Sequence, residues 1–120
     1  MKDNNIKVSI IMSVFNADIY LEESIKSILN QTFSDFEFII TNDNSSDNSN
    51  DILIHYRNID SRIKLISNVK NIGLTKSLNK MILISQGKYI ARMDADDIAL
   101  PTRIEEQVKY MEKNPEVIVC

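Results

Sequence analysis

Short apolar runs that favour β-strands alternate with segments of helical periodicity along the whole chain. Five such runs predict strands, at residues 8–14, 36–41, 63–66, 89–93 and 117–119. The first run is almost continuously apolar, which suits a strand that is buried on both faces of a sheet. Between the strands, apolar residues recur at the three- and four-residue spacing of amphipathic helices. The β-α-β-α-β-α-β-α-β order predicts an α/β fold, a three-layer α/β/α sandwich around a mainly parallel sheet.

Polar and helix-breaking residues mark the expected helix boundaries. Asn16 is expected to cap the first helix, Gly87 to follow the third, and Pro101 to lie in the first turn of the fourth. Residues 42–51 are dense in Asn, Asp and Ser and predict a loop. The sequence contains no repeat or linker, and 120 residues suffice for one hydrophobic core, so we predict a single domain over residues 1–120.

Composition excludes several classes of protein. The net charge of -3 argues against a nucleic-acid partner, which usually binds a basic surface. The only cysteine is Cys120, so neither a disulfide framework nor a cysteine-based metal site is expected. Residues 1–5 are polar and unlike a signal peptide, and no apolar run approaches the roughly 18 residues of a membrane span. We therefore expect a soluble, cytoplasmic domain.

Polar residues follow three of the predicted strands directly. They are residues 13–16 after the first strand, 42–43 after the second, and 94–97 after the fourth. Ligands of parallel α/β sheets bind beyond the carboxyl ends of the strands, where these residues are expected to meet. The coincidence of the three polar strand ends predicts the functional site.

The acidic cluster Asp94-Ala95-Asp96-Asp97 is the strongest candidate for chemistry. Its carboxylates repel one another unless a cation offsets their charge. Hard oxygen ligands select Mg²⁺ or Mn²⁺, and such an ion stabilises a departing diphosphate. Taken alone, the cluster is more typical of a solvated acidic turn before the last helix. Its place after a buried strand, beside two other polar strand ends, favours the metal site.

Other candidates have two interpretations each. Asp43 suits either a hydrogen bond to a nucleobase or an Asx-type turn after the second strand, and the sequence leaves both open. Lys76 and Arg92 suit a diphosphate, although a surface or ion-paired cation is the commoner role for such residues. His55, the only histidine, falls on the polar side of a short helix and is expected to be a solvated surface residue.

Five segments of the chain form a recognisable pattern. They are V-S-I-I-M-S-V-F-N at residues 8–16, S-I-L-N-Q-T at 27–32, N-D-N-S-S-D at 42–47, N-I-G-L at 71–74 and G-K-Y-I-A-R-M-D-A-D-D at 87–97. Together these segments resemble the family 2 glycosyltransferases, which have the GT-A fold, and they occur in the family's order and spacing over essentially the whole chain. Asn42 and Phe15 depart from the pattern, since the family usually has Asp at the first position and often Tyr at the second.

The resemblance implies a nucleotide-diphospho-sugar donor, commonly linked to UDP. It places Asp43 against the uracil, and it identifies the Asp-x-Asp motif as the site of Mn²⁺ or Mg²⁺, with Asp96 as the first contact through the ion. The donor-binding residues that it implies are Ser13, Phe15, Asp43, Lys76, Asp94 and Asp96, and the metal-binding residues are Asp94, Asp96 and Asp97.

The resemblance also implies transfer with inversion to a hydroxyl of a glycan or lipid-linked acceptor. That reaction needs a general base, and no segment of this chain resembles the family's base. The GT-A sheet is expected to be truncated after about the fifth strand, and the 120-residue chain to bind donor with little or no transferase activity. By analogy, the full-length protein is expected in polysaccharide or glycolipid assembly, with peripheral association at the inner face of the membrane.

Three alternatives compete with this interpretation. The chain could be a non-catalytic nucleotide-sugar-binding or interaction fragment, which metal-dependent binding of UDP would distinguish from a donor site. A receiver-like phosphoacceptor domain needs acidic residues after its first and third strands, whereas they follow the second and fourth here. A nucleotidyltransferase, a dehydrogenase or a phosphate-loop NTPase would each show a Gly-rich loop, which the sequence lacks.

Overall fold

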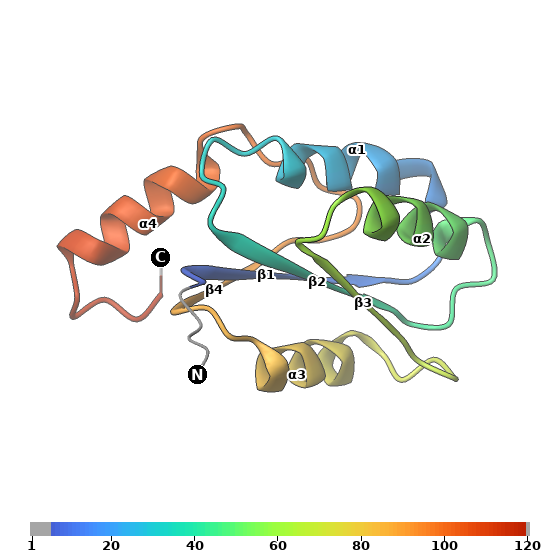
Figure 1. The fold of residues 1–120 in the computed structure, drawn as a ribbon. Helices are drawn as coiled ribbons and strands as arrows, with labels where there is room; N and C mark the ends of the chain where they lie inside the picture. The colour runs from blue at the N-terminus through green and yellow to red at the C-terminus, as the bar shows by residue number, and fades with distance from the viewer. Residues whose placement is uncertain (1–5, 120) are drawn as a thin grey trace.

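The computed structural model describes residues 6–119, which form one parallel four-stranded sheet between layers of helices (Figure 1). The strands lie in the order β3-β2-β1-β4, with α1 and α2 covering one face and α3 the other. This arrangement confirms the three-layer α/β fold. No helix among these residues is both long and apolar enough to span a membrane. The elements are β1 (Val8–Val14), α1 (Asp18–Leu29), β2 (Phe36–Asn42), α2 (Ser49–Ile59), β3 (Ile63–Ser67), α3 (Leu74–Ile84), β4 (Tyr89–Arg92) and α4 (Arg103–Lys113).

The predicted fifth strand at residues 117–119 is wrong. After α4 the backbone N–H of Val117 donates to the carbonyl of Asn114, and the chain continues without strand structure as far as residue 119. The side chains of Ile118 and Val119 are 88% and 81% exposed. An apolar run becomes a strand only where a neighbouring strand pairs with its N–H and C=O groups. Within residues 6–119, β4 is an edge strand and no segment pairs with its outer side.

The helix boundaries also differ from the expectation. Asn16 does not cap α1, because its backbone is left-handed (φ 49°) and its side chain instead accepts a hydrogen bond from the Ser46 N–H at 2.8 Å. Pro101 lies two residues before the start of α4, where its carbonyl accepts the Thr32 N–H at 2.9 Å. The last turn of α3 ends at Ile84, three residues before Gly87. At Asn16 and Pro101 a contact distant in sequence accounts for the difference, whereas α3 is ended locally by Ser85, whose N–H donates to the Ile82 carbonyl at 3.2 Å.

The two faces of the sheet differ in polarity. On the α1–α2 face, alternate strand residues such as Ile10, Met12 and Phe38 are fully buried against Leu21 and Ile25 of α1. The α3 face carries a smaller apolar cluster built on Ile11, Ile39 and Met81, with Ile66 and Leu78 packed beside it. The stability of the domain therefore comes mainly from the α1–α2 face. The α3 face also carries buried polar side chains, which hold loops in place.

Glu37 is the centre of a buried polar network on the α3 face. Its carboxylate is 2% exposed and accepts hydrogen bonds from Ser9 Oγ at 2.5 Å, Lys64 Nζ at 2.6 Å and the Gln86 N–H at 2.7 Å. Burial alone would raise the pKa of Glu37, but these three donors outweigh it and hold the pKa below its ordinary value of 4.5. Ser9 Oγ in turn accepts the Gly87 N–H at 2.8 Å. The network fixes the turn from α3 into β4.

Replacing Glu37 with glutamine is expected to lower the free energy of unfolding by about 2 kcal/mol at neutral pH, because buried donors lose a charged acceptor. The folded-state pKa of Glu37 is below its unfolded value, so the network stabilises above pH 4.5 and this contribution is lost as pH falls through the folded pKa. Urea unfolding of the chain and of Glu37→Gln at neutral and acidic pH measures the effect, with exposed Glu23→Gln as the control. A destabilisation that does not shrink in acid would contradict it.

Candidate functional site

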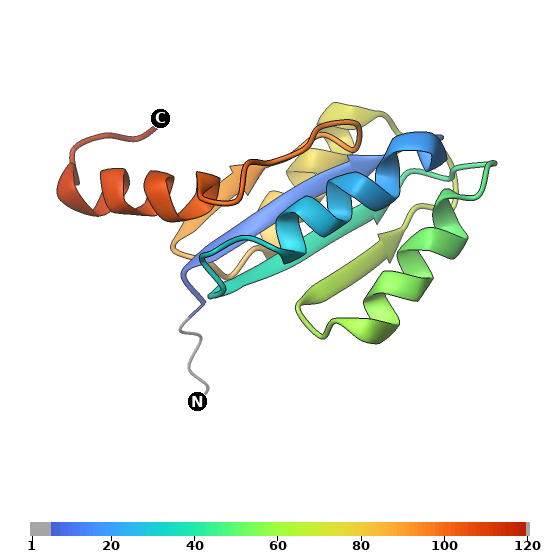
Figure 2. The ribbon, with the colours of Figure 1, turned by 90° about the horizontal axis from the view of Figure 1, so that it is seen from above.

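The polar residues that follow β1, β2 and β4 lie along one edge of the sheet, as predicted. The strand order places the end of β1 between the ends of β2 and β4. Val14 is paired with Asn42, and the Met93 N–H donates to the Ile11 carbonyl at 3.0 Å. Neighbouring strands are about 4.8 Å apart, so Asp43 and Asp94 follow strands that are roughly 10 Å apart. The loops after β1 and β2 and the acidic loop after β4 face the same end of the molecule (Figure 2).

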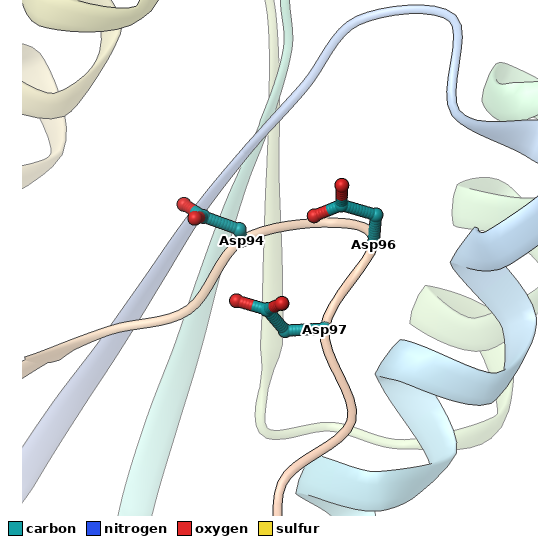
Figure 3. A group of neighbouring side chains, drawn as sticks. All are labelled: Asp94, Asp96 and Asp97. Carbon is teal, nitrogen blue, oxygen red and sulfur yellow. The ribbon is translucent and has the colours of Figure 1, made fainter.

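The three aspartates of the acidic cluster converge. Asp94, Asp96 and Asp97 are exposed, and one carboxylate oxygen of each lies within 4.8 Å of the others. Figure 3 shows the three side chains leaving one tight loop, which the Asp97 N–H closes by donating to the Asp94 carbonyl at 3.1 Å. Ala95 packs inward with 8% exposure, so the residues on either side point outward. Exposed hard oxygen ligands of this kind fit Mg²⁺ or Mn²⁺.

Arg92 provides the positive charge next to the cluster. Its guanidinium lies 3.1 Å from the Asp94 carboxylate, and both side chains are about half exposed. Arg103 fixes the end of β4 by donating to the Arg92 carbonyl at 3.0 Å. In this structure Arg92 is therefore an ion-paired cation, which is the commoner of the two roles that the sequence left open.

Asp43 is buried, and its carboxylate accepts three hydrogen bonds from one loop. Its side chain is 2% exposed, and it accepts hydrogen bonds at 2.9 Å from the Asn68 side chain, the Ile72 N–H and the Gly73 N–H. Burial would raise the pKa of Asp43, but the hydrogen bonds from these three residues, helped by the positive charge of Lys80, hold the pKa below its ordinary value. Asp43 thus ties the β3–α3 loop, residues 68–73, to the end of β2.

An Asx-type turn, one of the two interpretations that the sequence left open for Asp43, is formed instead by its neighbour Asn42. Asn42 Oδ1 accepts the Ser45 N–H at 3.0 Å, which closes the start of the loop after β2. The turn interpretation of Asp43 is therefore wrong, because its carboxylate points to the β3–α3 loop rather than to its own. Its proposed hydrogen bond to a nucleobase stays a prediction.

Asn68 and Lys80 belong to the site but were not identified from the sequence. The Asn68 amide nitrogen donates to Asp43 and to Ser77 Oγ, at 2.9 and 3.2 Å, and its oxygen accepts from Lys80 Nζ at 3.0 Å. One signal was available, since Asn68 directly follows β3 and is thus a fourth polar strand end. Lys76 is exposed in the first turn of α3 and makes no ion pair with any residue in the range 6–119.

The loops after β1 and β2 form one hydrogen-bonded unit. The Asp47 carboxylate accepts the N–H groups of Asp18 and Ser49, at 3.1 and 2.9 Å, and so caps the starts of both α1 and α2. This contact explains why the α1 cap does not come from Asn16. Beside the unit, Ser13 is half-buried at the end of β1 and the ring of Phe15 is 53% exposed. His55 is exposed on α2, as predicted.

The family model described as "Glycosyl transferase family 2" matches residues 9–120. The chain belongs to this family. It is 49% identical over 112 residues to an uncharacterized glycosyltransferase of Methanocaldococcus jannaschii, covering 92% of this chain and 39% of that protein. An uncharacterized glycosyltransferase of Haemophilus influenzae is 48% identical over 110 residues, which cover 92% of this chain and 34% of that protein. The chain thus spans about two-fifths or less of the length of these relatives.

Solved structures confirm the GT-A fold. Residues 1–349 of S. aureus TarS in complex with UDP-GlcNAc superpose with a TM-score of 0.84 at 24% identity, covering 91% of this chain and 32% of that 1–349 chain. The Pyrobaculum calidifontis mannosyltransferase PcManGT, in complex with GDP-Man and Mn²⁺, superposes with a TM-score of 0.80 at 19% identity, covering 89% of this chain and 32% of that one. At these identities the likeness concerns the fold alone.

In this family 2 chain, two residues of the S-I-L-N-Q-T segment hold the stretch of chain that follows the acidic cluster. Gln31 is 6% exposed; its side chain donates to the Leu100 carbonyl at 2.7 Å and accepts the Ile104 N–H at 3.0 Å. Ser27 Oγ accepts the Ala99 N–H at 3.0 Å. These contacts anchor the segment between the aspartates and α4 to α1. Sequence reasoning recognised the segment but did not predict what it holds.

Proposed function

We propose that this chain holds a nucleotide-diphospho-sugar donor, with UDP as the nucleotide, for transfer of the sugar to an acceptor hydroxyl. One observation carries the proposal: three converging carboxylates follow β4 at the sheet edge where the polar ends of β1 and β2 also lie. Membership of glycosyl transferase family 2 supports it. So does an Escherichia coli relative, 37% identical over 107 residues, which is named as a glucosyltransferase using UDP-Glc.

The acidic cluster would hold Mn²⁺ or Mg²⁺. Asp94, Asp96 and Asp97 supply three hard oxygen ligands, and Asp96 is our first choice for the contact with the donor through the ion. When bound, the ion would offset the negative charge that builds on the diphosphate as it leaves the sugar. The presence of Mn²⁺ together with GDP-Man in the PcManGT structure supports this assignment.

The nucleoside would lie over the ends of β1 and β2. Phe15 offers an exposed aromatic ring and Ser13 a hydroxyl group at the end of β1. An ionised carboxylate accepts about four hydrogen bonds, and Asp43 uses three within the protein, which leaves one acceptor position for the imide N–H of uracil. Lys76, exposed in the first turn of α3, would reach toward the diphosphate.

Deprotonation of the acceptor and transfer of the sugar need residues besides those of the donor site. We propose that residues 1–120 are a single donor-binding domain and that the general base and the acceptor site lie outside them. The acceptor would be a glycan or a lipid-linked sugar, transfer would proceed with inversion, and the full-length protein would work in the cytoplasm at the inner face of the membrane in polysaccharide assembly. The E. coli relative is named for an acceptor linked to diphosphoundecaprenol, which supports a lipid-linked substrate.

Nucleotide titration tests the proposal. With Mn²⁺ present, calorimetry is expected to show UDP binding at least about tenfold more tightly than CDP or ADP, because uracil presents a ring N–H to Asp43 and the pairing edges of cytosine and adenine do not. Sugar transfer by the 120-residue chain is expected to be undetectable. Equal affinity for all three nucleotides would contradict a uracil site. Absence of binding to any of them would favour the alternative, a non-catalytic interaction fragment.

Replacing Arg92 with glutamine is expected to strengthen Mn²⁺ binding about threefold to tenfold at low ionic strength. The substitution removes a positive charge that both repels the ion and occupies Asp94. Salt screens exposed charges, so the gain should shrink as NaCl is added. Manganese titration of the chain, of Arg92→Gln and of the surface control Arg57→Gln measures it. Weaker or unchanged binding in Arg92→Gln would show that Arg92 does not compete with the metal.

A further inference from the structure

The Asp43 carboxylate, the β3–α3 loop and the start of α3 are joined by one set of buried polar contacts. All three hydrogen bonds accepted by the Asp43 carboxylate come from that loop, two of them from the backbone of Ile72 and Gly73. Gly73 has φ 92°, a conformation that other residues rarely adopt, and its surroundings are open, so the backbone conformation and not lack of space requires glycine there. The loop therefore has the shape that Asp43 imposes.

Little else holds this loop in place. Val69, the second residue of the loop, is 95% exposed, and Lys70 and Asn71 are also exposed. A segment without buried apolar side chains gains little order from packing. The order of the loop must then come from its polar contacts, and these pass through Asp43 and Asn68.

Asn68 is oriented by Lys80. Asn68 is 7% exposed, and the Lys80 ammonium, which can only donate, approaches the side-chain oxygen of Asn68 at 3.0 Å. That contact determines the orientation of the Asn68 side-chain amide, with its oxygen toward Lys80 and its nitrogen toward Asp43 and Ser77. Reversing the amide would set its oxygen against the Asp43 carboxylate. Lys80 thus acts on Asp43 both through the Asn68 amide and by its charge.

We infer that Asn68 and Lys80 are positioning residues of the nucleotide site, which act through Asp43 without touching the donor. They keep Asp43 in place to receive the base, and they hold the β3–α3 loop against it. They also hold the first turn of α3, where Lys76 lies. This inference rests on the proposed function, since it concerns the same nucleotide site.

Paired titrations of the 120-residue chain test the inference, using UDP in the presence of Mn²⁺ and, separately, Mn²⁺ alone. Asn68→Ala is expected to weaken UDP binding about tenfold and Lys80→Met about threefold, because a charged acceptor loses an oriented donor. Lys80→Arg should keep the affinity of the wild type. Lys109→Met, a surface lysine on α4, is the matched control and should also bind like the wild type.

The metal titration separates positioning from a general loss of structure. The acidic cluster follows β4, two strands away from Asp43, so Mn²⁺ affinity without nucleotide should be the same in all variants. In NMR spectra, the Ile72 and Gly73 amides of Lys80→Met should exchange faster with solvent, while amides in β1 stay protected. If the wild type binds UDP and both Asn68→Ala and Lys80→Met bind it equally well, the inference is overturned and the proposed function stands.

Two other outcomes are also decisive. No UDP binding by the wild type would overturn the proposed function, and the inference with it. Loss of Mn²⁺ binding in Asn68→Ala would indicate a disrupted fold. In that case the UDP affinities of Lys80→Met and Lys80→Arg, both substitutions of an exposed residue, test the inference. Equal UDP affinity in those two variants would overturn the inference, and weaker binding in Lys80→Met alone would support it.

Discussion

Replacing Asp94 and Asp96 together with asparagine is expected to weaken Mn²⁺ binding by at least about hundredfold. Each substitution removes a negative charge and a strong oxygen ligand while keeping the size of the side chain, and two losses of about tenfold multiply. Asp97 alone would remain, and one carboxylate does not hold a hydrated divalent ion tightly. Calorimetric or paramagnetic titration of the chain with Mn²⁺ measures the effect.

The fold should tolerate this double substitution. The loop is tied to α1 by Ser24 Oγ, which donates to the backbone carbonyl of Asp94 at 3.2 Å and not to its carboxylate. Asp35→Asn with Asp51→Asn removes the same charge from exposed positions elsewhere and is the matched control. Without metal, the double variant of the cluster should be as stable as the wild type or slightly more so, because repulsion is relieved. Unchanged Mn²⁺ affinity would contradict the metal site.

Replacing Gly87 with alanine is expected to destabilise the chain by about 3 kcal/mol, the largest effect of a single substitution that we predict. The added Cβ would lie 2.5 Å from the Ser9 backbone nitrogen and 2.7 Å from the Val8 carbonyl carbon. Both atoms belong to β1, which is paired on both sides, so neither can move aside cheaply. The shift would also break the hydrogen bond from the Gly87 N–H to Ser9 Oγ.

Gly73→Ala is the matched control for this substitution. No atom lies within 4 Å of its added Cβ, so its cost comes only from the backbone conformation (φ 92°, ψ 164°), which is almost confined to glycine, and should be about 2 kcal/mol. Urea unfolding of both variants, followed by circular dichroism, gives the comparison. A Gly87→Ala variant as stable as Gly73→Ala would show that the turn into β4 adjusts more easily than its contacts indicate.

The order of strands and helices was predictable because its signals are local. Strand runs such as residues 8–14 and helical spacings such as Leu21, Ile25 and Ile28 depend only on neighbours in sequence. The same local signal at residues 117–119 predicted a strand that does not form, because a strand also needs a partner along its edge. The prediction that Asn16 caps α1 failed for a similar reason, since the cap comes from Asp47, which is distant in sequence.

The site was predictable only in part. The meeting of the acidic cluster with the ends of β1 and β2 followed from one rule, that parallel strands share a carboxyl edge. The contacts of Asp43 with Asn68, Ile72 and Gly73 span 25 to 30 residues, and no periodicity or motif connects them. Lys80 is still further away, and only the packing of α3 against the sheet brings it to Asn68.

The most direct test of the donor site is the affinity of this chain for UDP with and without Mn²⁺. We predict that Mn²⁺ tightens UDP binding at least about tenfold, since a bound ion would offset the negative charge of both the carboxylates and the diphosphate, and that this gain disappears in the Asp94→Asn, Asp96→Asn double variant. UDP affinity that is the same with and without Mn²⁺, in the wild type as in the double variant, would contradict the metal-dependent donor site.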